Sequence, residues 1–225
     1  MSCQTARTMN WPSIEELSKR APLPEGYRYE LLARHEIPEL IAAIEAWYPG
    51  IAVGNASCHL REDFYTSKVF LRGEVERDFI IILFKRGDEL VGLFSAELDR
   101  DSEVLYGRIA VIAPDYRGEH LSRNCLLLEE AIGRAMGLGM IYGLATLRYP
   151  QMQATFERLG WHLIGIIPGF DQEIVAPGVV KRVFEAVYAK VLTGEDELLL
   201  PRAKDMIPAV RALFDLLYPG RCIDP

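Results

Sequence analysis

Residues 111–130 read VIAPDYRGEHLSRNCLLLEE and join a strand-like run to a helix-like one through a short turn. Apolar residues recur every three or four positions from Leu121 onward, which predicts a helix over about residues 119–138. A helix start leaves backbone N–H groups unpaired and carries a partial positive charge of about half a unit. Such a start suits a phosphate group, and a pyrophosphate could lie on this one. Gly118 permits close backbone approach, and Ser122 offers a hydroxyl to phosphate oxygens.

Two motifs of the chain resemble those of the GNAT N-acetyltransferase superfamily. The run Pro114-Asp115-Tyr116-Arg117-Gly118 is similar to the start of the family's coenzyme A pyrophosphate loop, which reads Arg or Gln, two residues, Gly, one residue, Gly or Ala. His120 stands at the first glycine of that pattern, and Ser122 stands at the second small residue. The run FERLGW (156–161) is similar to a later motif of the family, an aromatic-Glu-Lys/Arg-Leu-Gly-aromatic sequence.

The patterns on either side predict a mixed α/β domain. Gly87-Asp88 joins two apolar runs and is a strong hairpin signal, and the strand, helix, strand order over residues 103–147 predicts a right-handed parallel crossover. Strands are expected at 27–34, 79–86, 89–98, 103–112, 140–147, 161–168 and 182–192, and helices at 12–20, 36–48, 119–138, 151–159 and 205–218. Ser13 and Glu16 are spaced as a capping box at the first helix. Residues 50–78 show no sustained period and are expected to form a variable excursion.

We expect three parts along the chain. Residues 1–26 form an N-terminal extension with a short helix, and residues 27–192 form the GNAT-like acyltransferase domain. Residues 193–225 form a helical tail, whose one-sided stripe contains Ile207, Val210, Phe214 and Leu217. We expect this stripe to pack on the domain, and a homodimer contact is the alternative.

Composition excludes several kinds of partner. The 225 residues carry 25 basic and 32 acidic side chains, for a net charge of -7, which opposes binding to nucleic acid or to an anionic membrane. No stretch reaches the roughly 18 apolar residues of a spanning helix, and the N-terminal residues lack the apolar core of a signal peptide. We therefore expect a cytoplasmic protein.

The cysteines and histidines do not form a metal-binding pattern. Cys3, Cys58, Cys125 and Cys222 contain no CxxC pair and are expected to be reduced, structural thiols. Cys58 adjoins His59, but no second Cys/His cluster completes a metal or nucleophile site. We expect no metal.

The resemblance implies a fold and a co-substrate. It implies a mixed, mostly antiparallel sheet of six or seven strands with helices on both faces, splayed between its fourth and fifth strands (103–112 and 140–147). Acetyl-CoA would be the co-substrate, with its pantetheine in the opening, paired with the backbone of residues 110–113. The residues expected to bind it are Ile112, Ala113, Arg117, Gly118, Glu119, His120, Leu121 and Ser122. The reaction would be direct transfer of the acetyl group to a primary amine in a ternary complex.

Proton transfer needs a base for the amine and benefits from an acid for the departing thiolate. The resemblance places Tyr106 where a base glutamate often lies in the family, and Glu97 or Glu103, acting through water, are the nearby carboxylates. It also places Phe156 where the family usually has a tyrosine acid. Tyr149 is the expected substitute, with Tyr188 as the alternative.

The substrate walls are expected from residues 50–78 and 169–178. Their acidic members Glu62, Asp63, Asp171 and Glu173 could steer a cationic amine. A small-molecule amine is the expected acceptor, and a protein or peptide amine is the alternative. Because the loop departs from the family pattern and position 156 is Phe, a catalytically weak coenzyme A-binding module is the alternative outside enzymes.

Overall fold

The computed structural model describes residues 9–222 of the chain; the expectation for Cys3 lies outside these residues. The chain forms two compact units, residues 1–192 and 193–225. An open sheet with the order β1-β3-β4-β5-β6-β8-β7 makes up the first unit, and β2 pairs with β3 outside this path. The strands are β1 (Tyr27–Leu31), β2 (Val69–Phe70), β3 (Phe79–Arg86), β4 (Glu89–Asp99), β5 (Val104–Ile112), β6 (Met140–Thr146), β7 (His162–Ala176) and β8 (Val179–Val191). The β2–β3 and β5–β6 pairs are parallel and the other pairs are antiparallel, which confirms the expected mixed sheet.

The strand count and the length of one strand differ from the expectation. The sheet has eight strands among the described residues, because the two-residue strand β2 is too short to produce a periodic signal. Residues 169–178 lie between the strands expected at 161–168 and 182–192. In the structure they continue β7 to Ala176, and only Pro177 and Gly178 form the turn into β8. Three register shifts interrupt the β7–β8 pairing, which explains why the alternation there is hard to read from the sequence.

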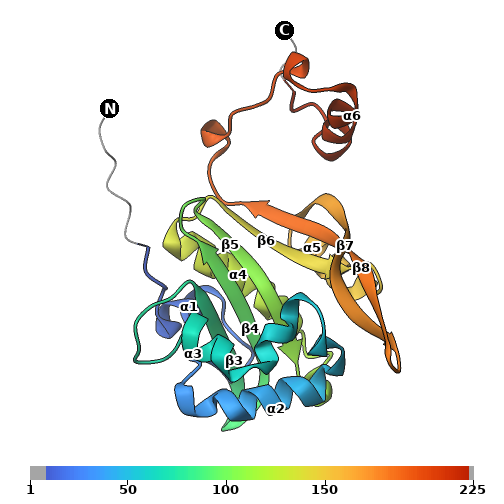
Figure 1. Cartoon of the computed structure of the whole chain (residues 1–225). Helices are drawn as coiled ribbons and strands as arrows, with labels where there is room; N and C mark the ends of the chain where they lie inside the picture. The colour runs from blue at the N-terminus through green and yellow to red at the C-terminus, as the bar shows by residue number, and fades with distance from the viewer. Residues whose placement is uncertain (1–8, 223–225) are drawn as a thin grey trace. The chain divides into compact units, whose positions relative to one another are not determined.

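Helices cover both faces of the sheet, as expected (Figure 1). Helices α1 (Ile14–Arg20), α4 (Leu121–Met136) and α5 (Pro150–Arg158) contribute buried side chains to one core. Helices α2 (Ile37–Trp47) and α3 (Glu62–Lys68) contribute to a second core on the other face. The Oγ atom of Ser13 accepts the N–H of Glu16 at 3.2 Å and caps α1, as its spacing predicts.

The sheet opens between β5 and β6 (Figure 1). These two strands pair only from Val104 to Gly107 on β5 and from Met140 to Gly143 on β6. A Cβ atom on Gly107 would lie 2.5 Å from Oε2 of Glu129, and a Cβ atom on Gly143 would lie 2.9 Å from Cζ of Phe156. Because these glycines lack a Cβ atom, Glu129 of α4 packs directly on β5 and Phe156 of α5 packs directly on β6, at the point where the β5–β6 pairing ends. Past this point β5 pairs with β4 and β6 pairs with β8, so the predicted splay is confirmed.

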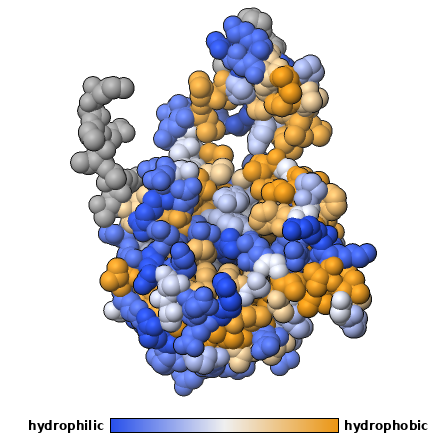
Figure 2. Space-filling model, viewed as in Figure 1, coloured by the Kyte–Doolittle hydropathy of each residue, from blue (hydrophilic) through white to orange (hydrophobic). Residues whose placement is uncertain are grey.

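The C-terminal unit contains helix α6 (Pro208–Leu217) and the short 3₁₀ helices η5 (Glu195–Glu197) and η6 (Ala203–Asp205). Arg221 forms an ion pair with Glu195 inside this unit. Apolar residues are present on the surface of this unit (Figure 2). The exposed apolar side chains of α6 and the residue before it include Ile207, Val210, Leu213 and Leu216. Packing of this stripe on the first unit, or on a second copy, stays a prediction.

No helix in residues 9–222 has the length and apolar character needed to cross a membrane.

Candidate active site

A cleft of about 630 Å³ occupies the opening between β5 and β6. Its walls include Arg108 to Val111 of β5 and Leu144 to Thr146 of β6. Ser122 in the first turn of α4 also lines it, and so does Glu185 of β8. The cleft therefore connects a helix N-terminus, an open strand edge and a buried carboxylate.

The start of α4 has the backbone of a glycine-rich loop. Gly118 has a φ of +99°, and His120, the residue before the helix, has a φ of 64° and a ψ of 9°. His120 thus adopts the left-handed conformation that the family's glycine would favour. Within residues 9–222 the N–H groups of His120, Leu121 and Ser122 donate to no acceptor. These groups and the helix dipole fit an anionic phosphate.

The other predicted coenzyme A residues surround this helix start but have different contacts. The Arg117 guanidinium donates to the carbonyl oxygens of Ile112 at 3.2 Å and Trp47 at 2.8 Å, so it braces the loop against the end of α2. Ala113 is buried and its N–H donates to Val91 at 2.9 Å. Glu119 accepts a hydrogen bond from the Tyr27 hydroxyl. Ile112 and Ala113 lie outside the cleft lining, and residues 109–111 line it instead.

His120→Gly is expected to stabilise the fold by about 0.5–1 kcal/mol, because glycine adopts a positive φ without strain. Coenzyme A affinity should not fall, since the N–H groups of the loop keep their places. Denaturant unfolding and calorimetry check the two parts. A variant less stable than the wild-type protein would contradict backbone strain at His120.

A polar cluster fills the cleft beside Tyr106. The Tyr106 ring stacks on Tyr142 with centroids 4.6 Å apart, and its hydroxyl accepts from Asn55 Nδ2 at 3.3 Å. Burial raises the pKa of Tyr106 above its usual range, so the phenol stays protonated near neutral pH. Arg108 lies over the Tyr106 ring at 5.0 Å, donates to Asn55 Oδ1 at 2.8 Å and pairs with Glu97 at 3.4 Å. Arg108 is the extra residue of a β-bulge, since Gly107 and Ile109 pair with successive residues of β4.

A buried histidine holds the loop that carries Asn55. His59, in the 3₁₀ helix η3 (Asn55–Leu60), is fully buried. Its Nε2 lies 3.0 Å from the Oγ of Ser95 and its Nδ1 lies 3.0 Å from the carbonyl oxygen of Ala56. Burial lowers the pKa of His59 to about 4. The neutral ring therefore donates to Ala56 and accepts from Ser95, which fastens η3 to β4.

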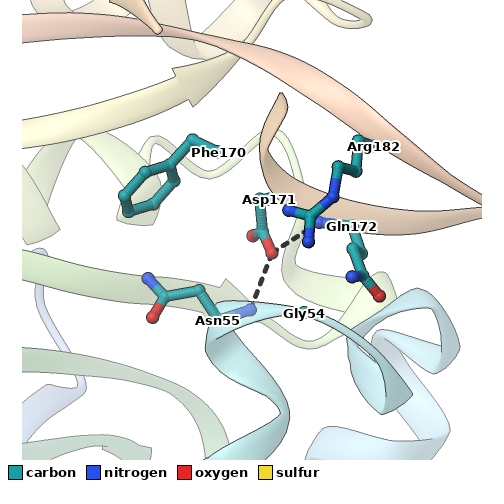
Figure 3. Close-up of a pocket in the computed structure, with 6 residues that line it drawn as sticks. All are labelled: Gly54, Asn55, Phe170, Asp171, Gln172 and Arg182. Carbon is teal, nitrogen blue, oxygen red and sulfur yellow. Dashed lines mark hydrogen bonds between the residues drawn. The ribbon is translucent and has the colours of Figure 1, made fainter. Parts of the chain in front are cut away.

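The acidic end of the cleft combines residues of β7 and β8. Asp171 Oδ1 accepts the N–H groups of Asn55 and Gln172, both at 2.7 Å (Figure 3). Glu173 pairs with Arg148. Glu185 is 6% exposed, and burial, followed by the charges of Asp171 and Glu173, raises its pKa to about 7. Glu185 was missed in the sequence, where its one signal is a lone carboxylate inside the apolar strand VFEAVYAKV (183–191).

Several predicted residues are not brought to the cleft. Glu62 and Asp63 lie exposed in the first turn of α3, and Glu103 lies exposed in the β4–β5 turn with a φ of 52°. Neither they nor Glu97 contribute to the cleft lining, whereas Tyr106, Asp171 and Glu173 do. Tyr149 also lines the cleft and is 51% exposed. Tyr188 is buried against Phe156 outside it.

Phe156 belongs to the core rather than to the cleft lining. Its ring stacks on Tyr188 at 4.8 Å and meets Trp161 edge-on at 5.0 Å. Its Cζ atom packs against Gly143 of β6.

Phe156→Tyr is expected to destabilise the fold by about 1–3 kcal/mol, because the new hydroxyl on Cζ would press against β6 without a partner. The pH-rate profile should not change. Melting temperature and turnover measured on the variant check this, and a gain in turnover with unchanged stability would place the ring beside the reacting sulfur instead.

No group of three or more His, Cys, Asp or Glu side chains that could hold a metal occurs in residues 9–222.

Known structures share this architecture at low sequence identity. No protein-family model matches the chain, and no curated protein sequence matches it. The spermidine/spermine N-acetyltransferase SpeG from Vibrio cholerae has a TM-score of 0.59 and 12% identity over 75% of this chain and 95% of its own. The ribosomal L7/L12 α-N-protein acetyltransferase RimL, in complex with coenzyme A, has a TM-score of 0.57 and 12% identity over 76% of this chain and 97% of its own. An IAA acetyltransferase from Bacillus cereus has a TM-score of 0.51 and 13% identity, covering 74% and 99%. The chain therefore has the fold of the GNAT N-acetyltransferases, as its motifs predict.

Proposed function

We propose that this protein is an N-acyltransferase that moves an acetyl group from acetyl-CoA to the primary amine of a small molecule, by direct transfer in a ternary complex. The observation that carries this proposal is the single cleft lined by Ser122 at the start of α4, by the separated strands β5 and β6, and by Glu185. It offers a phosphate site, a channel and an amine site in one connected space.

The helix start is proposed to bind the coenzyme A pyrophosphate. The free N–H groups of His120, Leu121 and Ser122 supply donors, and the α4 dipole adds a favourable field. Gly118 leaves the backbone open, since a Cβ atom there would meet nothing within 4 Å. The neighbour RimL, which was solved with coenzyme A, supports the use of this co-substrate.

The open edge of β5 is proposed to bind the pantetheine. Beyond Gly107 this strand has no β6 partner, so amides of the pantetheine can pair with its backbone over residues 109–111. This position holds the thioester between the strands, where an amine in the same cleft reaches its carbonyl carbon. Holding both reactants in line supplies much of the rate enhancement that such a reaction needs. Tyr149, exposed at the cleft wall, is proposed to protonate the departing thiolate.

The volume of the cleft favours a small acceptor. The 3₁₀ segment η2 (Pro49–Ala52) and η3 form one wall of the cleft, and Phe170 to Ile174 of β7 form another. About 630 Å³ is within the usual range of small-molecule sites.

Thiol release tests the proposal. The protein is incubated with acetyl-CoA and pooled amines, with peptides bearing free N-termini in a parallel pool, and free coenzyme A thiol is measured. Amine-dependent thiol release is expected. Tight coenzyme A binding without thiol release in either pool would contradict the enzyme and leave a coenzyme A-binding module, and release with the peptides alone would contradict the small acceptor.

A further inference from the structure

Glu185 is a buried carboxylate without a partner at the acidic end of the cleft. It lies on β8 opposite Thr146 of β6, whose side chain lines the same cleft. Its two acidic neighbours are engaged, since Asp171 accepts two backbone N–H groups and Glu173 pairs with Arg148. Over residues 9–222 no hydrogen bond or ion pair reaches the Glu185 carboxylate. A buried carboxylate with this surrounding is suited to a cationic ligand.

The remaining groups around Glu185 complete a site for a cation. Tyr48, beside η2, and Tyr149, before α5, are 44% and 51% exposed and line the same space. Their rings can contact an ammonium group and the carbon chain that bears it. Arg148 is bound to Glu173, and Arg108 of β5 is bound to Asn55 and Glu97. The three carboxylates of Asp171, Glu173 and Glu185 therefore outnumber the two guanidiniums of the cleft lining, both of which are already paired, and this charge balance disfavours a substrate carboxylate.

We propose that Glu185 receives the ammonium group of the acceptor and takes its proton, and that the acceptor is a cationic amine with no carboxylate next to its amino group. The inference rests on the proposed function and names the base and the substrate class of that same site. The ammonium N–H donates its proton to the Glu185 carboxylate. The nitrogen lone pair then forms the C–N bond with the thioester carbonyl carbon, the C–S bond breaks, and the thiolate leaves with the bonding electrons. The amide nitrogen loses its remaining extra proton to solvent, and Tyr149 protonates the thiolate. Glu185 then releases its proton to solvent and Tyr149 takes one up, which restores both side chains.

The pH-rate profile of Glu185→Gln tests the base. In the wild-type protein kcat/KM is expected to rise with pH through an inflection near the Glu185 pKa of about 7. Glu185→Gln should lose this inflection and about 10²-fold in kcat above pH 7. Glu185→Asp should keep the inflection at reduced kcat. Glu76→Gln is the matched control, since Glu76 is exposed in a loop outside the cleft, and its profile should match the wild-type one.

The possible results separate this inference from the proposed function. Coenzyme A binding, measured by calorimetry, should be equal in all four proteins, and equal melting temperatures show that each is folded. An inflection that persists in Glu185→Gln, or one that disappears in Glu97→Gln instead, overturns Glu185 as base while the acyltransferase stands. Bound coenzyme A with no amine acylated in the wild-type protein overturns both.

Matched acceptors test the substrate class. Tyramine and tyrosine, and agmatine and arginine, differ only in the carboxylate beside the amino group. We expect kcat/KM to be at least 10-fold higher for the amine of each pair and the ratio to shrink in Glu185→Gln. Equal kcat/KM values within both pairs, or a preference for the amino acids, would overturn the proposed class.

Discussion

Ser122→Glu is expected to weaken coenzyme A binding by at least about 30-fold, or about 2 kcal/mol, without loss of melting temperature. Ser122 is exposed in the first turn of α4 and lines the cleft. A glutamate there adds a negative charge where the pyrophosphate is proposed to lie, and like charges this close repel. The same charge favours the helix, because a carboxylate near a helix N-terminus interacts well with the dipole. Binding and stability should therefore change in opposite directions.

Ser122→Gln separates charge from size. It has nearly the same volume as the glutamate but no charge, so its coenzyme A affinity should fall by less than about 5-fold. Calorimetric titration at two salt concentrations adds a second check, because the penalty of the glutamate should shrink as salt screens it. Equal affinities for the two variants would remove the pyrophosphate from this helix start.

The second large effect is a loss of stability in mild acid caused by His59. The pKa of its ring falls from 6.5 in the unfolded chain to about 4 in the buried site. Below pH 6.5 the unfolded chain therefore takes up a proton that the folded chain does not. The stability that the neutral ring contributes is complete above pH 6.5 and is lost as pH falls to about 4, a change of about 3 kcal/mol.

His59→Gln isolates this contribution from that of the carboxylates. The glutamine amide can still hydrogen-bond to Ser95 and to the Ala56 carbonyl but does not titrate. The free energy of unfolding of the wild-type protein minus that of the variant, measured in denaturant at several pH values, should fall by about 3 kcal/mol between pH 6.5 and 4. A difference that does not vary with pH would show that His59 titrates normally and lies outside a buried site.

The frame of the fold follows from local sequence signals. Gly87-Asp88 supplies the turn between β3 and β4, and the apolar stripe beginning at Leu121 forms α4 with nearly its predicted bounds. The loop before α4 was also recognisable, although His120 takes a backbone conformation normally left to glycine. Such features are readable because neighbouring residues in the chain determine them.

The interior of the cleft depends on residues that are far apart in the chain, and here sequence reasoning was weaker. His59 meets Ser95 across 36 positions, a contact that no local pattern indicates. Glu185 stands out only when β6, β7 and β8 are assembled, because its burial and its acidic neighbours come from three strands. The strand position of Glu97 made it a reasonable candidate for the base. In the structure, however, Arg108 at the β5 bulge forms an ion pair with the Glu97 carboxylate.

Amide chemical shifts during titration with coenzyme A test whether the co-substrate binds in the splayed cleft. We expect the largest changes on His120, Leu121 and Ser122 at the start of α4, and on residues 109–111 along the open edge of β5. Changes confined to other elements, with both of these segments unaffected at saturation, would contradict coenzyme A binding in the splayed cleft.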